Sequence, residues 1–290
     1  MKLPGPFAIT RVVESEGAFS APEFLLPEAV PEAFATTAVS RDPRFYDAAS
    51  NKLVMGFYAL IVRTERNVIL VDTCVGNDKE RPARPEWHRR NGSFLADLAA
   101  SGCPAEDVTH VLCTHLHVDH VGWNTRLIGG RWVPTFPNAK YLMARKEVEH
   151  WEEVRRGDRS VNHASWDDSV QPILDAGRAV IVDSDYEIEP GVRLMPAPGH
   201  TPGNVMLCLD DGKSRAFLVG DTIHHPVQIE RPQWSSRFCS DPAQAQATRI
   251  AFIERVADSG AWIMPAHFAA PTAVQITGGA HGFGFKTPQA

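Results

Sequence analysis

The sequence predicts an α/β fold in which mixed sheets carry helices on their outer faces. Apolar runs with strand character alternate with helical segments between residues 54 and 268. Some of these strands also follow one another in adjacent pairs, which a purely parallel, doubly wound sheet would not produce. A chain of 290 residues with 43% hydrophobic residues is long enough to bury a substantial core.

Residues 1–50 are predicted to form an irregular N-terminal arm that packs on the core or on a partner subunit. Four prolines interrupt any helix there before it lengthens: Pro22, Pro27, Pro31 and Pro43. One folded domain is expected over residues 51–290. The arm is compatible with a homodimer, in which it would lie on the second copy.

Regular structure is expected to begin with two strands, at 54–63 and 67–72, which are rich in β-branched and aromatic residues. A short amphipathic helix follows at 93–101, with Ser93 as its N-cap and Gly102 at its end. The apolar segment 108–114 predicts a strand, and the charged segment 145–156 predicts a surface helix.

The C-terminal half contains three further apolar runs that predict strands, at 192–197, 205–209 and 215–219. A helix is expected over 241–259, because Asp241 can cap it and Pro242 suits its first position. A last strand is expected near 261–264.

Charge and composition argue against nucleic-acid and membrane partners. The net charge is −6, and no apolar run approaches the roughly 18–20 residues of a membrane span. Four arginines in one loop are expected to form a solvated charged segment: Arg81, Arg84, Arg89 and Arg90. The N-terminus shows no secretory signal and the five cysteines form no CxxC pair, so a reduced, cytoplasmic protein is expected.

The segment that carries most chemical information is His115-Leu116-His117-Val118-Asp119-His120, directly after the strand predicted at 108–114. Polar side chains are rarely concentrated at the end of a buried strand without a partner. Imidazole nitrogen and carboxylate oxygen are ligands that zinc accepts. If the chain stays extended, His115 and His117 point the same way. A turn at Val118 would send Asp119 and His120 towards a second metal.

Three other apolar runs each deliver one metal-competent residue just beyond their ends. These residues are His200, Asp221 and His267. Open α/β sheets place their ligands at such strand ends. A single histidine there is usually structural, but four runs that do the same predict one site.

The ordered series HxHxDH, GHTPG, GD after a strand and a late PAH resembles the metallo-β-lactamase superfamily over roughly residues 54–268. The resemblance implies a four-layer αβ/βα sandwich with two mixed β-sheets and metals at one edge. Asp72 matches the acidic residue that closes an early strand in that family and supports the HxHxDH loop.

The resemblance also implies two zinc ions, although other divalent metals are compatible with the same ligands. His115, His117 and His200 would hold one ion, Asp119, His120 and His267 the other, and Asp221 would bridge them. The true zinc β-lactamases carry a cysteine at the position of Asp221, which argues against antibiotic hydrolysis. The aspartate fits the branch that contains glyoxalase II, lactonases, phosphotriesterases and the RNase Z relatives.

The activity that this resemblance implies is hydrolysis of a small apolar ester or lactone by a hydroxide that bridges the metals. Asp119 would relay a proton to the leaving group. His224 stands where the acyl-homoserine lactonases carry a tyrosine and is a candidate catalytic residue. An apolar pocket is expected from a group of bulky side chains: Phe57, Tyr58, Ile229, Trp234, Phe238, Phe268, Phe283 and Phe285. The glycine-rich segment 278–284 could close over it.

Three alternatives remain open at this stage. The first is a phosphotriester hydrolase with the same two metals. The second is a mononuclear iron dioxygenase of the persulfide type, which would use two histidines and one aspartate. The third is a metal-stabilised binding module without activity. A serine hydrolase is not expected, because the sequence contains no GxSxG motif.

Overall fold

The computed structural model describes residues 2–279 and 282–288. The chain divides into two compact units. The first contains Met1–Lys2, Phe7–Glu14 and Phe57–Ser184, and the second contains Leu3–Pro6, Ser15–Gly56 and Asp185–Ala290. The boundary between them falls inside two long strands, β2 (Ala8–Ser20) and β4 (Lys52–Arg63), and the folded domain over residues 51–290 stays a prediction.

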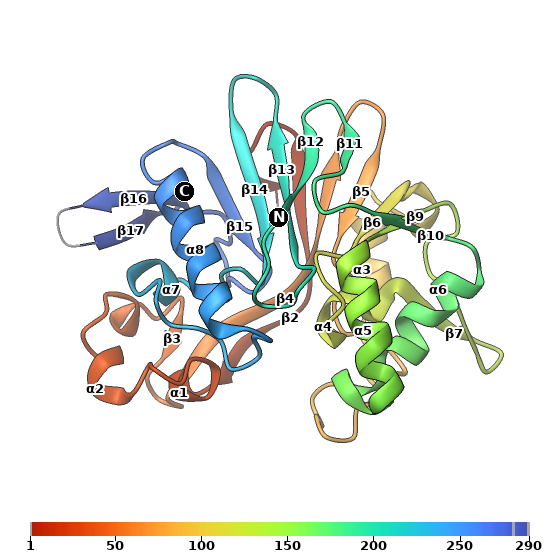
Figure 1. The fold of residues 1–290 in the computed structure, drawn as a ribbon, viewed down its shortest axis with the longest axis horizontal. Coiled ribbons are helices and arrows are strands. Elements are labelled where there is room, and N and C mark those ends of the chain that lie inside the picture. The colour runs from red at the N-terminus through yellow and green to blue at the C-terminus, as the bar shows by residue number, and fades with distance from the viewer. Residues whose placement is uncertain (1, 280–281, 289–290) are drawn as a thin grey trace. The chain divides into compact units, whose positions relative to one another are not determined.

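One sheet has the order β1-β2-β4-β5-β6-β9-β10, with β3 paired to β4 (Figure 1). β4 pairs antiparallel with β5, and β5, β6, β9 and β10 pair in parallel. The sheet is therefore mixed, as predicted. Its remaining strands are β1 (Lys2–Leu3), β3 (Tyr46–Asp47), β5 (Val68–Val71), β6 (His110–Leu112), β9 (Lys140–Ala144) and β10 (Ala179–Val182).

Alternate residues of these strands form the apolar core of the first unit. Ile61, Val111 and Tyr141 pack together with the buried faces of three helices. These helices are α3 (Phe94–Ala100), α5 (Arg145–Gly157) and α6 (Gln171–Asp175). The unit also contains α4 (Val118–Val121) and the hairpin β7 (Thr125–Ile128) and β8 (Arg131–Pro134), which the sequence pattern did not predict.

The second unit is built on a five-stranded sheet of order β11-β12-β13-β14-β15 (Figure 1). Its strands are β11 (Glu187–Glu189), β12 (Val192–Pro196), β13 (Val205–Asp210), β14 (Arg215–Gly220) and β15 (Trp262–Pro265). Only β14 and β15 run parallel, and the chain between them forms α8 (Pro242–Val256). The Asp241 side chain accepts a hydrogen bond from the Gln244 N–H, which confirms the predicted cap.

The prediction of an irregular arm is wrong for residues 8–20, which form the 13-residue strand β2. The strand precedes Pro22, Pro27, Pro31 and Pro43, and two of these prolines occupy the first positions of short helices. The helices are α1 (Pro22–Leu25) and α2 (Pro31–Phe34). Leu26, Phe34 and Phe45 pack with Val227 and Trp234, so this part of the arm belongs to the core of the second unit.

The second unit also contains α7 (Val227–Glu230) and the hairpin β16 (Gln275–Gly279) and β17 (Gly282–Lys286). The hairpin occupies the glycine-rich segment predicted as a cover, of which residues 280–281 lie outside the described ones. Across residues 2–279 and 282–288, no helix combines the length and the apolar composition needed to cross a bilayer. The cytoplasmic location and the homodimer stay predictions.

Candidate metal centre

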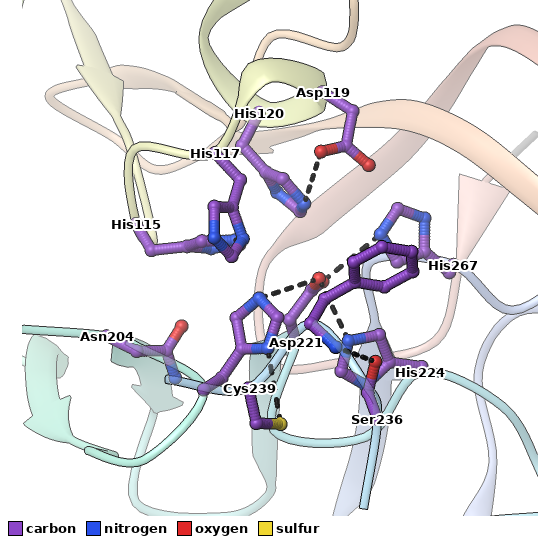
Figure 2. Close-up of polar contacts among 12 residues, drawn as sticks. His115, His117, Asp119, His120, Asn204, Asp221, His224, Ser236, Cys239 and His267 are labelled. Carbon is purple, nitrogen blue, oxygen red and sulfur yellow. Dashed lines mark hydrogen bonds and ion pairs between the residues drawn. The ribbon is translucent and has the colours of Figure 1, made fainter. Parts of the chain in front are cut away.

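The HxHxDH segment of the first unit spans the end of the loop after β6 and the first three residues of α4. His115 and His120 are buried, whereas His117 and Asp119 are partly exposed. The His115 Nε2 atom lies 3.0 Å from the His117 Nδ1 atom, and Asp119 Oδ1 lies 3.8 Å from His120 Nε2 (Figure 2). The segment therefore gathers three imidazoles and a carboxylate, and the His115 and His117 rings lie in contact.

Asp72 supports this loop from the end of β5. Its carboxylate accepts hydrogen bonds from the Thr114 N–H at 2.8 Å and from the Thr114 hydroxyl at 2.9 Å. Its Oδ2 atom lies 2.9 Å from His120 Nδ1. Because Asp72 engages Nδ1, the nitrogen of His120 that can bind a metal is Nε2. The support that the resemblance implied for Asp72 is confirmed.

Two further supports of the loop were missed by the sequence analysis. The Glu147 side chain on α5 is buried and accepts hydrogen bonds from the Leu116 N–H at 2.9 Å and from Trp151 Nε1 at 2.6 Å. The Asn162 amide accepts from the Val118 N–H and donates to the Leu116 carbonyl. Glu147 lies four residues before Trp151, on the apolar face of a charged helix. A carboxylate at such a position in the sequence indicates a buried polar contact.

In the second unit, the segments that follow three strands bring three imidazoles to a single carboxylate, that of Asp221. His200 follows β12, Asp221 follows β14 and His267 follows β15. Asp221 Oδ2 lies 3.3 Å from His200 Nε2 and 3.2 Å from His224 Nε2, and Asp221 Oδ1 lies 3.2 Å from His267 Nε2 (Figure 2). All four side chains are buried.

The second nitrogen of two of these histidines has a different partner. His267 Nδ1 lies 3.0 Å from the Gly56 carbonyl oxygen, and His200 Nδ1 lies 3.6 Å from Cys239 Sγ. Both histidines therefore present Nε2 to Asp221. The turn that carries His200 needs Gly199, because its φ is +128° and a Cβ there would lie 2.2 Å from the Ala245 nitrogen at the start of α8.

His224 is fixed by the loop that follows Asp221. The buried Gln228 side chain accepts a hydrogen bond from the His224 N–H at 2.7 Å and donates to the Trp234 carbonyl. The buried Arg249 guanidinium donates to the Trp234 and Pro232 carbonyls of the same segment. Burial lowers the pKa of His224, which Asp221 opposes, so the imidazole is neutral at neutral pH.

The donor chemistry of each unit fits a divalent metal. Imidazole nitrogens and carboxylate oxygens are the ligands of zinc sites. The second nitrogens of His120, His200 and His267 are engaged by a carboxylate, a thiol and a carbonyl, as in sites where outer contacts orient metal ligands. A buried carboxylate with three imidazole nitrogens around it is also a place where a cation is electrostatically favoured.

Four of the side chains expected to line an apolar pocket pack into the core instead. Ile229 and Phe268 lie in the apolar core of the second unit, and Trp234 and Phe285 pack with the arm. The expected solvated arginine loop is wrong for Arg81, which is fully buried and makes two hydrogen bonds to Asp168, at 2.7 and 2.9 Å. A charge run in sequence does not show that one of its members has a buried partner.

Residues 54–267 match the family model of the metallo-beta-lactamase superfamily, so the chain belongs to this superfamily. Among curated proteins, it is 31% identical over 177 residues to an N-acyl homoserine lactonase of a Bacillus species, covering 56% of this chain and 61% of the relative. An N-acyl homoserine lactonase of Bacillus cereus is 27% identical over 184 residues, which cover 58% of this chain and 64% of that protein. The matched segment thus spans less than two thirds of these relatives.

Two solved structures share the fold over nearly the whole chain. The hydrolase AbOPH of the beta lactamase superfamily has a TM-score of 0.81 at 21% identity, covering 99% of this chain and 96% of its own. AidC, a dizinc quorum-quenching lactonase solved with a product, has a TM-score of 0.77 at 22% identity, covering 100% and 97%. These likenesses confirm the predicted fold class.

Proposed function

We propose that this protein is a metal-dependent hydrolase that opens a small lactone, or cleaves a related ester. The observation that carries the proposal is the buried Asp221 carboxylate with three imidazole Nε2 atoms within 3.3 Å. This arrangement occurs in a chain whose superfamily is established, and the two relatives described above are named lactonases. The phosphotriester and dioxygenase alternatives are not favoured by these relatives.

The proposed ligands are those that the sequence predicted. His115, His117 and His200 would hold one ion, Asp119, His120 and His267 the other, and Asp221 would contact both. Zinc is the proposed metal, supported by the nitrogen and oxygen donor set and by the dizinc lactonase that shares the fold. When bound, two such ions lower the pKa of their water from 15.7 to roughly 7 and polarise the scissile carbonyl.

Two side chains are proposed to act on the substrate. Asp119 is partly exposed and lies at the start of α4, so it can receive a proton and pass it to the leaving alkoxide. His224 is neutral and held rigidly by its backbone, so its ring can donate one N–H to the substrate carbonyl oxygen. The substrate is then a small molecule with a carbonyl electrophile.

The test is a metal analysis together with a substrate panel on purified protein. We expect about two divalent ions per chain, and turnover of an N-acyl homoserine lactone and a simple lactone that a chelator removes and Zn²⁺ restores. An aryl ester and a phosphotriester complete the panel, with His117→Ala as the inactive control. Full turnover after complete metal removal, or one iron per chain with oxygen consumption, would overturn the proposal.

A further inference from the structure

His117 directly precedes α4. The backbone groups of the residues on either side of it, Leu116 and Val118, both bond to the side chain of Asn162. Asn162 Nδ2 donates to the Leu116 carbonyl at 2.7 Å, and Asn162 Oδ1 accepts from the Val118 N–H at 2.9 Å. An amide that bridges the residues on both sides of His117 fixes the direction of the peptide planes around it. His117 is also the partly exposed one of the three imidazoles of this segment.

Asn162 can make both contacts because of an unusual backbone. Asn162, His163 and Ala164 have φ values of 54°, 56° and 57°, which is three consecutive residues in the left-handed region. Residues other than glycine adopt this conformation at a cost, and asparagine does so most readily among them. Three in succession persist only where the surroundings over-determine them.

A buried cation supplies that constraint. Arg81 Nη1 donates to the His163 carbonyl at 3.0 Å, inside the left-handed segment, and the same guanidinium makes two hydrogen bonds to the Asp168 carboxylate. Lys79 Nζ donates to the Asp168 carbonyl at 3.0 Å. Arg81 and Lys79 are both fully buried. The loop containing Arg81 therefore holds the segment at His163 and again at Asp168.

We propose that Asn162 is the positioning residue of His117, and that the Arg81–Asp168 ion pair holds Asn162 in the left-handed conformation that this role requires. The inference deepens the proposed function, because it assigns residues that set how tightly the His115–His117 pair binds a metal. It also makes a claim about the metal-free protein, namely that the Val118 amide is protected by Asn162.

The experiment compares Asn162→Gly with Asn162→Ala. Glycine accepts the left-handed backbone and removes only the amide, whereas alanine removes the amide and disfavours the backbone. We expect both to weaken Zn²⁺ binding 10–100-fold, the range found when outer contacts of metal ligands are removed. We also expect faster hydrogen exchange at Val118 in the metal-free protein. Arg159→Gln is the matched control: it breaks an exposed ion pair with Asp167 in the same segment and should change neither readout.

The second step is tested with Arg81→Gln alone and combined with Asn162→Gly, with Asp168→Asn as the alternative if Arg81→Gln does not fold. We expect the double variant to bind Zn²⁺ no more weakly than Asn162→Gly, because both changes act through the same amide. Additive losses would overturn this step. Unchanged Zn²⁺ affinity and unchanged Val118 exchange in both Asn162 variants would overturn the first. The wild-type protein could bind no metal while hydrogen exchange at Val118 is still faster in the Asn162 variants. In that case the proposed function fails and the positioning contact stands.

Discussion

The two units present metal-competent side chains in opposite ways. In the first unit they lie within six consecutive residues, and side chains from other elements hold the backbone of that segment. Glu147 and Asn162 bond to its backbone, and Asp72 contacts the His120 ring and the Thr114 N–H just before the segment. In the second unit, His200, Asp221 and His267 come from separate strand ends, and the side chains contact one another directly.

The difference appears most clearly in the two buried aspartates. Asp72 faces His120 Nδ1, the nitrogen that a metal would not use, whereas Asp221 faces Nε2 of three histidines. In the first unit the carboxylate therefore orients a proposed ligand. In the second unit it lies where three imidazoles converge, and we expect the same substitution to have different consequences at the two positions.

Asp221→Asn is expected to have the largest effect. It removes the negative charge that the three imidazoles surround but keeps the volume of the side chain, so the apolar core nearby should be undisturbed. We expect loss of one metal equivalent and a fall in kcat/KM on the order of 1,000-fold, beyond the 10–100-fold of outer-contact changes. Metal analysis and steady-state kinetics measure both.

The matched control is Asp72→Asn, an equally buried aspartate in the first unit. Because it acts only through His120 and Thr114, we expect a loss within 10–100-fold in metal affinity or activity. Equal effects at the two positions would contradict the distinction between an orienting and a ligating carboxylate.

His224→Phe tests whether His224, one of the three imidazoles around Asp221, acts on the substrate. Phenylalanine keeps an aromatic ring and removes both nitrogens. If His224 donates a hydrogen bond to the substrate, we expect kcat to fall about 100-fold with metal content unchanged. The neighbouring His225 is the control, because its Nε2 lies 2.9 Å from the Phe45 carbonyl oxygen and not at the site. His225→Gln should keep near-normal kcat, and loss of metal in His224→Phe would show that His224 is a ligand instead.

The same contrast explains what the sequence could and could not predict. The HxHxDH loop is contiguous, so its residue types and its place after a strand were sufficient to predict a metal-binding loop. His200, Asp221 and His267 were predictable for another reason: each stands directly after an apolar run, and strand ends are where such groups meet. In both cases the informative residues directly follow an apolar run that predicts a strand.

The supports of the loop were harder to predict because their partners are distant in sequence. Asn162 acts through a left-handed turn and Arg81 through a carboxylate 87 residues away, and neither contact leaves a local pattern. The strand β2 was missed for a different reason. The prolines of residues 22–43 dominated the interpretation of the whole arm, although residues 8–20 contain none.

The smallest effect on activity is expected from the pH dependence of stability. The two units differ here too, because a buried base with a lowered pKa titrates over a different pH range in each. Burial lowers the pKa of His225 in the second unit to about 4 and that of Lys79 in the first unit to about 7. The unfolded chain then binds more protons than the folded one between each lowered pKa and its ordinary value. Stability from His225 is therefore present above pH 6.5 and is lost as the pH falls to 4. Stability from Lys79 is present above pH 10.5 and is lost as the pH falls to 7.

Urea unfolding of the wild type, His225→Gln and Lys79→Met across this pH range measures both contributions. The free energy difference between wild type and His225→Gln should change by roughly 3 kcal/mol between pH 6.5 and 4 and stay constant above pH 7. The difference for Lys79→Met should change only in the alkaline window. If the free energy of unfolding of both variants departed from wild type over the same pH range, these two pKa assignments would be contradicted. His225 and Lys79 are expected to titrate over different pH ranges.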